Sequence, residues 1–283
     1  MTLLLEAPGI DVNRAAGMKY EGMTPLVVAR IEGFSEVVAL LEAAGAQANY
    51  TLHSATNEGN AGEVARLLGA PWIDVNRVDW KGNTPLTCAS AFDHTEVVKV
   101  LLAAPGIDVN RANEDGRTPL HWASQEGHSA VVKLLLAAPG IDVNRADKDG
   151  ITPLYAASKN GLAEVVELLL EAPGMDVNLA DKAGETPLFG ASHEGHLEVV
   201  KLLLRAPGTD VFKTGEDGKT ALEMATDPLV ISALERVVVK RTCGGLLLAL
   251  MHRGVDRDHA AGLAIHGLPS EHYKDIARSM RKW

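Results

Sequence analysis

Residues Thr118-Pro119-Leu120-His121-Trp122-Ala123 decide the fold, because the triplet that opens this stretch recurs along the chain at a fixed interval. The other copies are Thr84-Pro85-Leu86, Thr152-Pro153-Leu154, Thr186-Pro187-Leu188 and the weaker Thr220-Ala221-Leu222. Each step is 34 residues, and Tyr50-Thr51-Leu52-His53 lies one further step upstream of Thr84. Such a period is typical of an array of stacked units rather than of a single globular core.

Each period begins with a short helix whose two ends are marked in the sequence. Thr118 is a helix N-cap, and Pro119 occupies the first helical position, where its missing N–H costs nothing. The pattern predicts a helix over 120–125 that ends at Gly127, a residue that tolerates positive φ. A second, strongly apolar helix then contains residues 131–136.

The second half of each period is a loop and a turn. Pro139-Gly140 ends the second helix, residues 141–144 form a loop, and Asp147-Lys148-Asp149-Gly150 is a turn sequence. One period is therefore a helix–turn–helix unit with a projecting hairpin, which we call the finger. A single unit of this kind cannot bury its own apolar face, so the units must stack.

This arrangement resembles the ankyrin repeat, whose signature Thr-Pro-Leu-His-x-Ala is matched at every fixed place by residues 118–123. The resemblance covers residues 1–238. It implies an all-α solenoid of helix–turn–helix units with short β-hairpin loops, to which a C-terminal helical extension is added. It also implies a protein–protein interaction module, a scaffold or an adaptor, rather than an enzyme.

The repeat register divides the chain. We expect a partial repeat at 1–18, repeats at 19–49, 50–78, 79–112, 113–146, 147–180 and 181–214, a degenerate closing repeat at 215–238, and a tail at 239–283. The join between Asn49 and Tyr50 lacks about eight finger residues, so it should be the weakest internal interface of the array. Asp93 stands where glycine usually ends the first helix, although Asp tolerates the left-handed region better than most residues.

Composition limits the classes of function. The net charge is −10 over 283 residues, which disfavours nucleic-acid binding because such a surface repels phosphates. Cys88 and Cys243 are too few for a disulfide framework and indicate a reducing compartment. The most apolar stretch, 244–251, is too short to cross a bilayer, and no signal-peptide pattern is present. We expect a monomeric cytosolic protein, with a nuclear location as the alternative, and no membrane partner.

Several local patterns mimic active sites, but the register accounts for each of them. Gly218-Lys219-Thr220 lacks the earlier glycine of a phosphate-binding loop, because position 213 is lysine. His193-Glu194-Gly195-His196 does not have the His-Glu-x-x-His spacing of a zinc helix. Cys88 fits a small packing position. We therefore predict no catalytic residues, no metal and no cofactor, and we interpret the tail histidines His252, His259, His266 and His272 as exposed or capping.

Specificity should come from positions that differ among the repeats, which are the finger tips and the ends of the first helices. The candidate protein-binding residues are Trp80, Lys81, Asn83, Phe92, Glu114, Asp115, Arg117, Gln125, Lys148, Asp149, Ile151, Lys159 and Asn160. The resemblance implies that they line one concave face. Trp80, Phe92 and Arg117 are the expected solvent-facing anchors, since Trp and Arg are favoured at interfaces. The alternative for Trp80 is packing on the neighbouring finger.

Two further hypotheses concern modification and the tail. Asn110, Asn144 and Asn178 have the spacing that asparaginyl hydroxylases of the ankyrin-modifying type accept, so their hydroxylation is expected where such an enzyme is present. In the tail, Leu246–Met251 predicts a helix ended by Gly254, and two more helices follow. The tail is either a cap on the closing repeat or a docking motif, because Leu268-Pro269-Ser270-Glu271 with Ile276 resembles an F-box opening, the element that recruits ubiquitin-ligase scaffolds. An enzyme centre in the tail is the remaining alternative.

Overall fold

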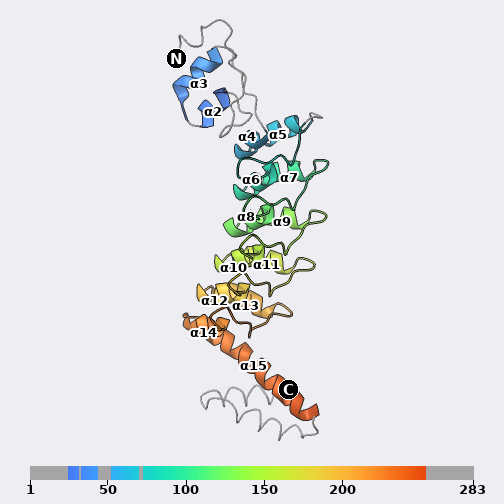
Figure 1. Ribbon diagram of the computed structural model, residues 1–283, viewed down its shortest axis with the longest axis vertical. Helices are drawn as coiled ribbons and strands as arrows, with labels where there is room; N and C mark the ends of the chain where they lie inside the picture. Colours follow the sequence, from blue (N-terminus) through green and yellow to red (C-terminus); the bar gives the residue numbers. More distant parts are fainter. Residues whose placement is uncertain (1–24, 32, 44–51, 70–72, 253–283) are drawn as a thin grey trace. The chain divides into compact units, whose positions relative to one another are not determined.

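The computed structural model describes residues 25–31, 33–43, 52–69 and 73–252 (Figure 1). It divides into two compact units, Met1–Ala157 with Glu167–Met175, and Ser158–Val166 with Asp176–Trp283. Within the described residues the fold is all-α, as predicted, and the only β-type pairing is one isolated bridge between Thr214 and Thr220.

The helices come in short pairs that follow the predicted period. The first unit holds α2 (Pro25–Ile31), α3 (Ser35–Ala43), α4 (Leu52–Asn57), α5 (Ala61–Leu68), α6 (Pro85–Ala91), α7 (Thr95–Leu102), α8 (Pro119–Glu126) and α9 (Ser129–Leu136). Two helices contain residues of both units, α10 (Pro153–Lys159) and α11 (Ala163–Leu170). The second unit holds α12 (Pro187–His193), α13 (Leu197–Arg205), α14 (Ala221–Met224) and α15 (Pro228–His252).

The predicted helix signals are confirmed at the atomic level. Thr118 is extended, and its side-chain oxygen accepts a hydrogen bond from the His121 backbone N–H, while Pro119 is the first helical residue. Gly127 follows α8 with a φ of 82°, in the left-handed region that suits glycine. Thr84 and Thr186 cap α6 and α12 in the same way, so one local signal starts the first helix of several repeats.

The core of the first unit lies between successive helix pairs. Figure 1 shows α4 with α5, α6 with α7, and α8 with α9 as consecutive layers, and the first and second helices of each layer contact their counterparts in the next. The side chains between these layers are fully buried; they include Leu86, Val97, Val98, Leu101, Leu120, Val131, Val132 and Leu135. Apolar burial of this kind is the main favourable term, at about 25 cal/mol per Å² of apolar surface.

A ladder of asparagine side chains joins consecutive loops. The Asn110 Nδ2 atom donates to the Gly140 carbonyl at 2.7 Å, and its Oδ1 atom accepts from the Asp142 N–H at 2.8 Å. Asn76 makes the same pair of bonds with Gly106 and Asp108. Each asparagine therefore reaches 30 and 32 residues forward, which fixes the register of one repeat on the next.

The second unit repeats this ladder once and then ends it. Asn178 donates to the Gly208 carbonyl at 2.9 Å and accepts from the Asp210 N–H at 2.7 Å. One period later the position belongs to Phe212, which has no carboxamide, and α14 is only four residues long. The ladder therefore closes at the repeat predicted to be degenerate.

The last described helix continues through residue 238, where we expected the closing repeat to end. The Asp227 Oδ1 atom accepts from the backbone N–H groups of Leu229 and Val230 at the start of α15, and the helix then runs without a break to His252. An Arg241 guanidinium nitrogen donates to the Thr209 carbonyl. The stop predicted at Gly254 and the rest of the tail lie outside the described residues, as do residues 44–51 at the shortened join.

Candidate functional site

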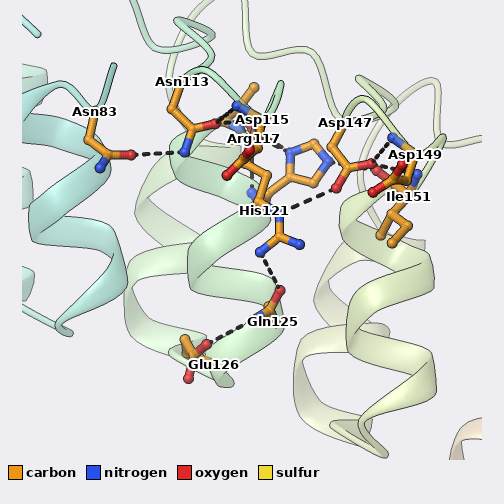
Figure 2. Close-up of polar contacts among 11 residues, drawn as sticks. Asn83, Asn113, Asp115, Arg117, His121, Gln125, Glu126, Asp147, Asp149 and Ile151 are labelled. Carbon is orange, nitrogen blue, oxygen red and sulfur yellow. Dashed lines mark hydrogen bonds and ion pairs between the residues drawn. The ribbon is translucent and has the colours of Figure 1, made fainter. Parts of the chain in front are cut away.

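Each finger that begins with an aspartate or an asparagine is closed by the side chain of that residue. The Asp147 Oδ1 atom accepts from the Asp149 N–H at 2.9 Å and from the Ile151 N–H at 3.0 Å (Figure 2). Asp79 binds the N–H groups of Lys81 and Asn83 in the same way, each at 2.8 Å. A backbone bond from the Asp147 N–H to the Ile151 carbonyl completes the turn. The predicted hairpins are thus tight turns rather than pairs of strands.

Neighbouring fingers are joined through their backbones. The Glu114 N–H donates to the Lys81 carbonyl at 3.2 Å, and the Lys148 N–H donates to the Asp115 carbonyl at 2.9 Å. The side chains of all four residues remain exposed, and so does that of Asp149. The fingers of the first unit therefore present these predicted contact residues on a hydrogen-bonded backbone.

Two large aromatic side chains of the first unit are exposed to solvent. Trp80, on a finger, is 66% exposed, and the Lys81 Nζ atom lies 4.7 Å from its ring centroid. Phe92, just beyond the end of α6, is 62% exposed, and its ring centroid is 6.1 Å from that of His94. The alternative of Trp80 packing against the neighbouring finger does not fit an exposure this high.

Arg117 differs from the expectation, because it is not a free solvent-facing anchor. The Arg117 Nε atom lies 3.3 Å from the Asp147 Oδ2 atom, and the Arg117 Nη1 atom donates to the Gln125 Oε1 atom at 3.3 Å (Figure 2). The guanidinium also lies 5.2 Å above the Trp122 ring centroid. Asp147, 30 residues ahead, is almost fully buried, so the charge pair draws Arg117 inward to link two repeats.

Two other predicted contact residues also face into the stack. Asn83 is half-buried, and its Oδ1 atom accepts from the Asn113 Nδ2 atom at 2.9 Å. Ile151 is half-buried as well, and its carbonyl pairs with the His121 Nε2 atom at 2.8 Å. Burial lowers the pKa of His121, and that of His53, which pairs with the Asn83 carbonyl. These residues hold the fingers to the helices.

Lys159 and Asn160 belong to the second unit, at and just beyond the end of α10, and both are exposed. The Lys159 carbonyl pairs with the His196 Nε2 atom at 2.9 Å. His94 and His128 reach the Asn57 and Ala91 carbonyls in the same manner. The recurrence of these histidines was visible in the sequence, but their role as bridges between repeats was not.

Sequence reasoning missed two exposed carboxylates of the first unit, Glu58 and Glu126. They occupy the same position in their repeats as Phe92, one period before it and one period after it. A comparison of the residues that follow each first helix could have found them, because the signal is the position and not the residue type.

The patterns that mimic active sites are structural, as predicted from the register. Thr220 caps α14, and Gly218 has a φ of 75° in the last finger. His196 directly precedes α13. Cys88 is buried, and burial raises the pKa of its thiol to about 12, so the thiol stays protonated at neutral pH.

No three His, Cys, Asp or Glu side chains in the described part of the chain lie close enough to hold a metal ion. Over the same residues, no helix combines the length and the hydrophobicity that a membrane crossing requires.

Comparison with known proteins identifies similar sequences and structures. A family model described as ankyrin repeats (3 copies) matches residues 52–147 and 140–215. The crystal structure of the ankyrin repeat domain of Bcl-3, a member of the IκB protein family, is 30% identical with a TM-score of 0.62 and covers 76% of this chain and 99% of its own. The ankyrin repeat protein EF0377 is 26% identical with a TM-score of 0.61, covering 68% of this chain and 99% of its own. No curated protein matches significantly.

Proposed function

Because the chain belongs to the ankyrin-repeat family, whose repeats are protein-binding modules, we propose that it binds another protein through its finger tips and the ends of its first helices. The observation that carries this proposal is the exposure of Trp80, on the finger that precedes α6, and of Phe92, just beyond the end of α6. Both aromatic side chains belong to one repeat, so one partner can contact a finger tip and the end of a first helix in the same repeat.

The remaining tip residues complete the proposed surface in the first unit. Glu114, Asp115 and Asp149 are acidic and Lys148 is basic, and their backbones are hydrogen-bonded between fingers, which favours orientation of a partner more than raw affinity. Buried aromatic anchors supply most of the binding free energy in interfaces of this kind. We therefore assign affinity to Trp80 and Phe92 and orientation to the charged tips.

The test is capture of a partner from native lysate with the full chain and its Trp80→Ala/Phe92→Ala variant. We expect each substitution to weaken binding by about thirtyfold or more, because hot-spot truncations cost about 2 kcal/mol or more each. The melting temperature of the double variant should stay close to that of the unaltered chain, since both rings are exposed. Lys201→Ala, in the middle of α13 and outside the proposed surface, is the control. Unchanged capture by the double variant would refute this surface.

The proposal includes no catalytic activity, a monomeric state and a cytosolic or nuclear location. The buried, protonated Cys88 thiol is compatible with a reducing compartment. Light scattering during size-exclusion chromatography tests the monomer, and fractionation of the source cells tests the location. The F-box-like segment at 268–276 lies outside the described residues, so the ubiquitin-ligase adaptor remains a prediction from sequence, to be tested by scaffold binding.

Hydroxylation of Asn110, Asn144 and Asn178 is a further part of the proposal. Each Nδ2 atom donates to a glycine carbonyl in the next loop, at 2.7, 2.7 and 2.9 Å respectively. Modification would therefore require that loop to open. Mass spectrometry after incubation with an asparaginyl hydroxylase tests the idea, and peptides without added oxygen would exclude it.

A further inference from the structure

Neighbouring fingers of the first unit are joined by a backbone bond that recurs from one junction to the next. The second residue of a finger donates its N–H to the third residue of the finger before it: Glu114 to the Lys81 carbonyl at 3.2 Å, and Lys148 to the Asp115 carbonyl at 2.9 Å. A glycine follows the accepting carbonyl in both fingers. A Cβ added at Gly116 would lie 2.8 Å from the Lys148 nitrogen, so the finger that accepts the bond needs glycine there.

A second contact joins the same fingers through their side chains. The first residue of a finger pairs with the last residue of the finger before it, as Asn113 does with Asn83 at 2.9 Å and Asp147 with Arg117 at 3.3 Å (Figure 2). Both junctions therefore use the same two groups of the following finger, which are a backbone N–H and the side chain that closes the turn. In the second junction that side chain is a carboxylate and its partner is a cation.

The finger that begins at Asp79 has both of these groups, but the repeat before it lacks a finger, because the sequence is shortened between Asn49 and Tyr50. Within the described ranges the Trp80 N–H has no acceptor, and the Asp79 Oδ2 atom accepts only from Asn83 of its own finger, at 3.3 Å. An exposed tryptophan also stands where the later fingers have a charged residue. We call Asp79 and Trp80 the open finger edge.

We propose that the open finger edge binds a finger-like turn of the partner protein, which takes the place of the missing finger. This inference rests on the proposed protein-binding function and names the form of the partner segment. It continues the finger-to-finger contacts already present in the array, since a backbone donor at the edge of a hydrogen-bonded series can accept another chain. A carbonyl of the turn accepts from the Trp80 N–H, and the Trp80 ring packs on the turn.

The existing junctions fix the sequence pattern of the partner turn. The residue after the accepting carbonyl is glycine, because it has the positive φ of Gly116, 84°, and a larger residue would strike the Trp80 nitrogen. The next residue is lysine or arginine, which pairs with the Asp79 carboxylate as Arg117 pairs with Asp147. The expected pattern is thus any residue, then glycine, then a basic residue, in a turn opened by aspartate or asparagine.

Hydrogen exchange of the full chain tests whether the edge is open. The Trp80 N–H should exchange at least about tenfold faster than the N–H groups of Glu114 and Lys148, because those two groups have carbonyl partners. Equal protection of Trp80 in the free chain would show that another part of the chain already fills the edge, and it would overturn the inference.

Binding of a synthetic finger to the full chain, measured by fluorescence anisotropy, tests the partner pattern. The labelled peptide has the sequence of residues 111–117, Arg-Ala-Asn-Glu-Asp-Gly-Arg, closed by a disulfide between added terminal cysteines. One matched peptide has alanine in place of glycine, and another has glutamate in place of the last arginine. Each change should weaken binding at least about tenfold, through a steric clash and through charge repulsion respectively. Equal affinities, or no binding of the first peptide, would contradict the pattern.

Asp79→Asn separates recognition from folding. Asn113 closes its own finger by accepting from the Asp115 and Arg117 N–H groups, so an asparagine at position 79 should keep the turn and the melting temperature. Without the carboxylate, the chain should bind the arginine and glutamate peptides with similar affinities. Asp149→Asn removes the same charge from another finger tip and should leave the difference between these peptides unchanged. A persistent tenfold difference in Asp79→Asn would refute the assigned charge pair.

A restored finger provides the complementary variant. A copy of residues 111–117 inserted between Asn49 and Tyr50 should protect the Trp80 N–H from exchange and abolish peptide binding, because the edge is then filled within the chain. Unchanged peptide binding by a folded insertion variant would place the peptide elsewhere. If the insertion prevents folding, the Asp79→Asn comparison decides the outcome.

The two proposals can fail separately. Lysate capture that depends on Trp80 and Phe92, together with no binding of the synthetic finger, would retain the proposed surface and reject the turn as its partner. Binding of the synthetic finger that requires Asp79, together with lysate capture that is indifferent to Trp80 and Phe92, would support the open finger edge and reject the aromatic surface.

Discussion

Individual polar side chains have two distinct tasks in the first unit, and Arg117 illustrates why residue type alone does not separate them. Its charge faces Asp147, which is itself bound by the Asp149 and Ile151 N–H groups. The exposed Lys148 occupies a finger tip of the same pair of repeats. The first cation stabilises the stack, and the second remains available to solvent.

This contrast predicts opposite effects on stability. Arg117→Ala should lower the free energy of unfolding by about 1–3 kcal/mol, because it leaves the buried Asp147 carboxylate without its cation. Lys148→Ala should change it by less than about 0.5 kcal/mol, as is usual at exposed sites. Urea denaturation of both variants measures the difference. Equal stabilities would show that the Arg117–Asp147 pair contributes nothing to the fold.

Buried histidines predict a dependence of stability on pH. The His121 Nδ1 atom accepts from the Thr118 N–H, so its Nε2 atom carries the proton and donates to the Ile151 carbonyl. Burial, aided by nearby Arg117 and Arg145, lowers the pKa of His121 in the folded state. The unfolded chain therefore binds protons more readily, and folding stability should fall as pH drops below about 6.5.

The measurement is urea denaturation of the full chain at about pH 7.5 and pH 5.5. His121→Gln should be less stable at the higher pH but should lose less stability on acidification, because the titrating group is gone. His53, whose pKa is lowered by the same cause, accounts for part of the remaining slope. A variant with the full pH dependence of the unaltered chain would remove His121 as its source.

Residue roles were predictable where they depend on neighbours in sequence. Thr118, Pro119 and Gly127 act within one turn of helix, and their roles were predicted correctly. Arg117 was not, because its partner Asp147 lies 30 residues away and the choice between solvent and stack depends on that partner's burial.

At the scale of elements, the backbones of neighbouring fingers lie very close together. Gly116 has a φ of 84°, and a Cβ at this position would lie 2.8 Å from the Lys148 backbone nitrogen. That nitrogen donates to the Asp115 carbonyl in the bond that joins two fingers. Gly140, in the loop after α9, has a similar φ of 77°, yet an added Cβ would have nothing within 4 Å.

These two glycines therefore form a matched pair for testing finger contact. Gly140→Ala should lose about 1–2 kcal/mol of stability, the cost of placing alanine in the left-handed region. Gly116→Ala should lose about 1–3 kcal/mol more, because it adds a steric clash with backbone that cannot move away easily. Thermal or urea unfolding distinguishes them. Similar losses of stability for both variants would mean that the two fingers can move apart with no cost in free energy.

The short helices were the most predictable elements. A capping threonine, proline at the first position and glycine after the last turn mark the limits of α8 to within a residue. The finger was harder to predict, because a turn sequence does not reveal whether strands flank it. Here the Asp147 side chain closes the turn, and the backbone then pairs with the next finger instead of forming a ladder within its own.

For the molecule as a whole, the least predictable feature was where the array ends. Ala221, in place of the proline at the first helical position, indicated a closing repeat, and the structure adds the loss of the bridging asparagine at Phe212. The unbroken course of α15 beyond residue 238 was not expected, because helical periodicity does not show whether two predicted helices are joined. The Arg241 bond to the Thr209 carbonyl favours the cap interpretation for the start of the tail.

The unbroken course of α15 predicts that two truncations of the tail will differ in their effect on stability. Removing residues 239–283 would cut α15 and delete Arg241, so we expect a lower melting temperature or aggregation. Removing residues 253–283 leaves α15 whole and should cost less stability. Calorimetry and light scattering on the two truncated chains provide the comparison. Full stability and solubility after the longer deletion would contradict a capping role for residues 239–252.

The forward reach of the asparagine ladder limits how this chain can change in length over evolution. Every rung spans 30 or 32 residues, and each repeat between the first and the last rung both receives a rung and extends one. Duplication or loss of a whole 34-residue period would leave each rung with an equivalent partner. An insertion of any other size inside a rung would separate a carboxamide from its glycine carbonyl. Related sequences should therefore gain and lose length in whole 34-residue periods. Insertions and deletions of other sizes should occur mainly in segments that no asparagine rung spans.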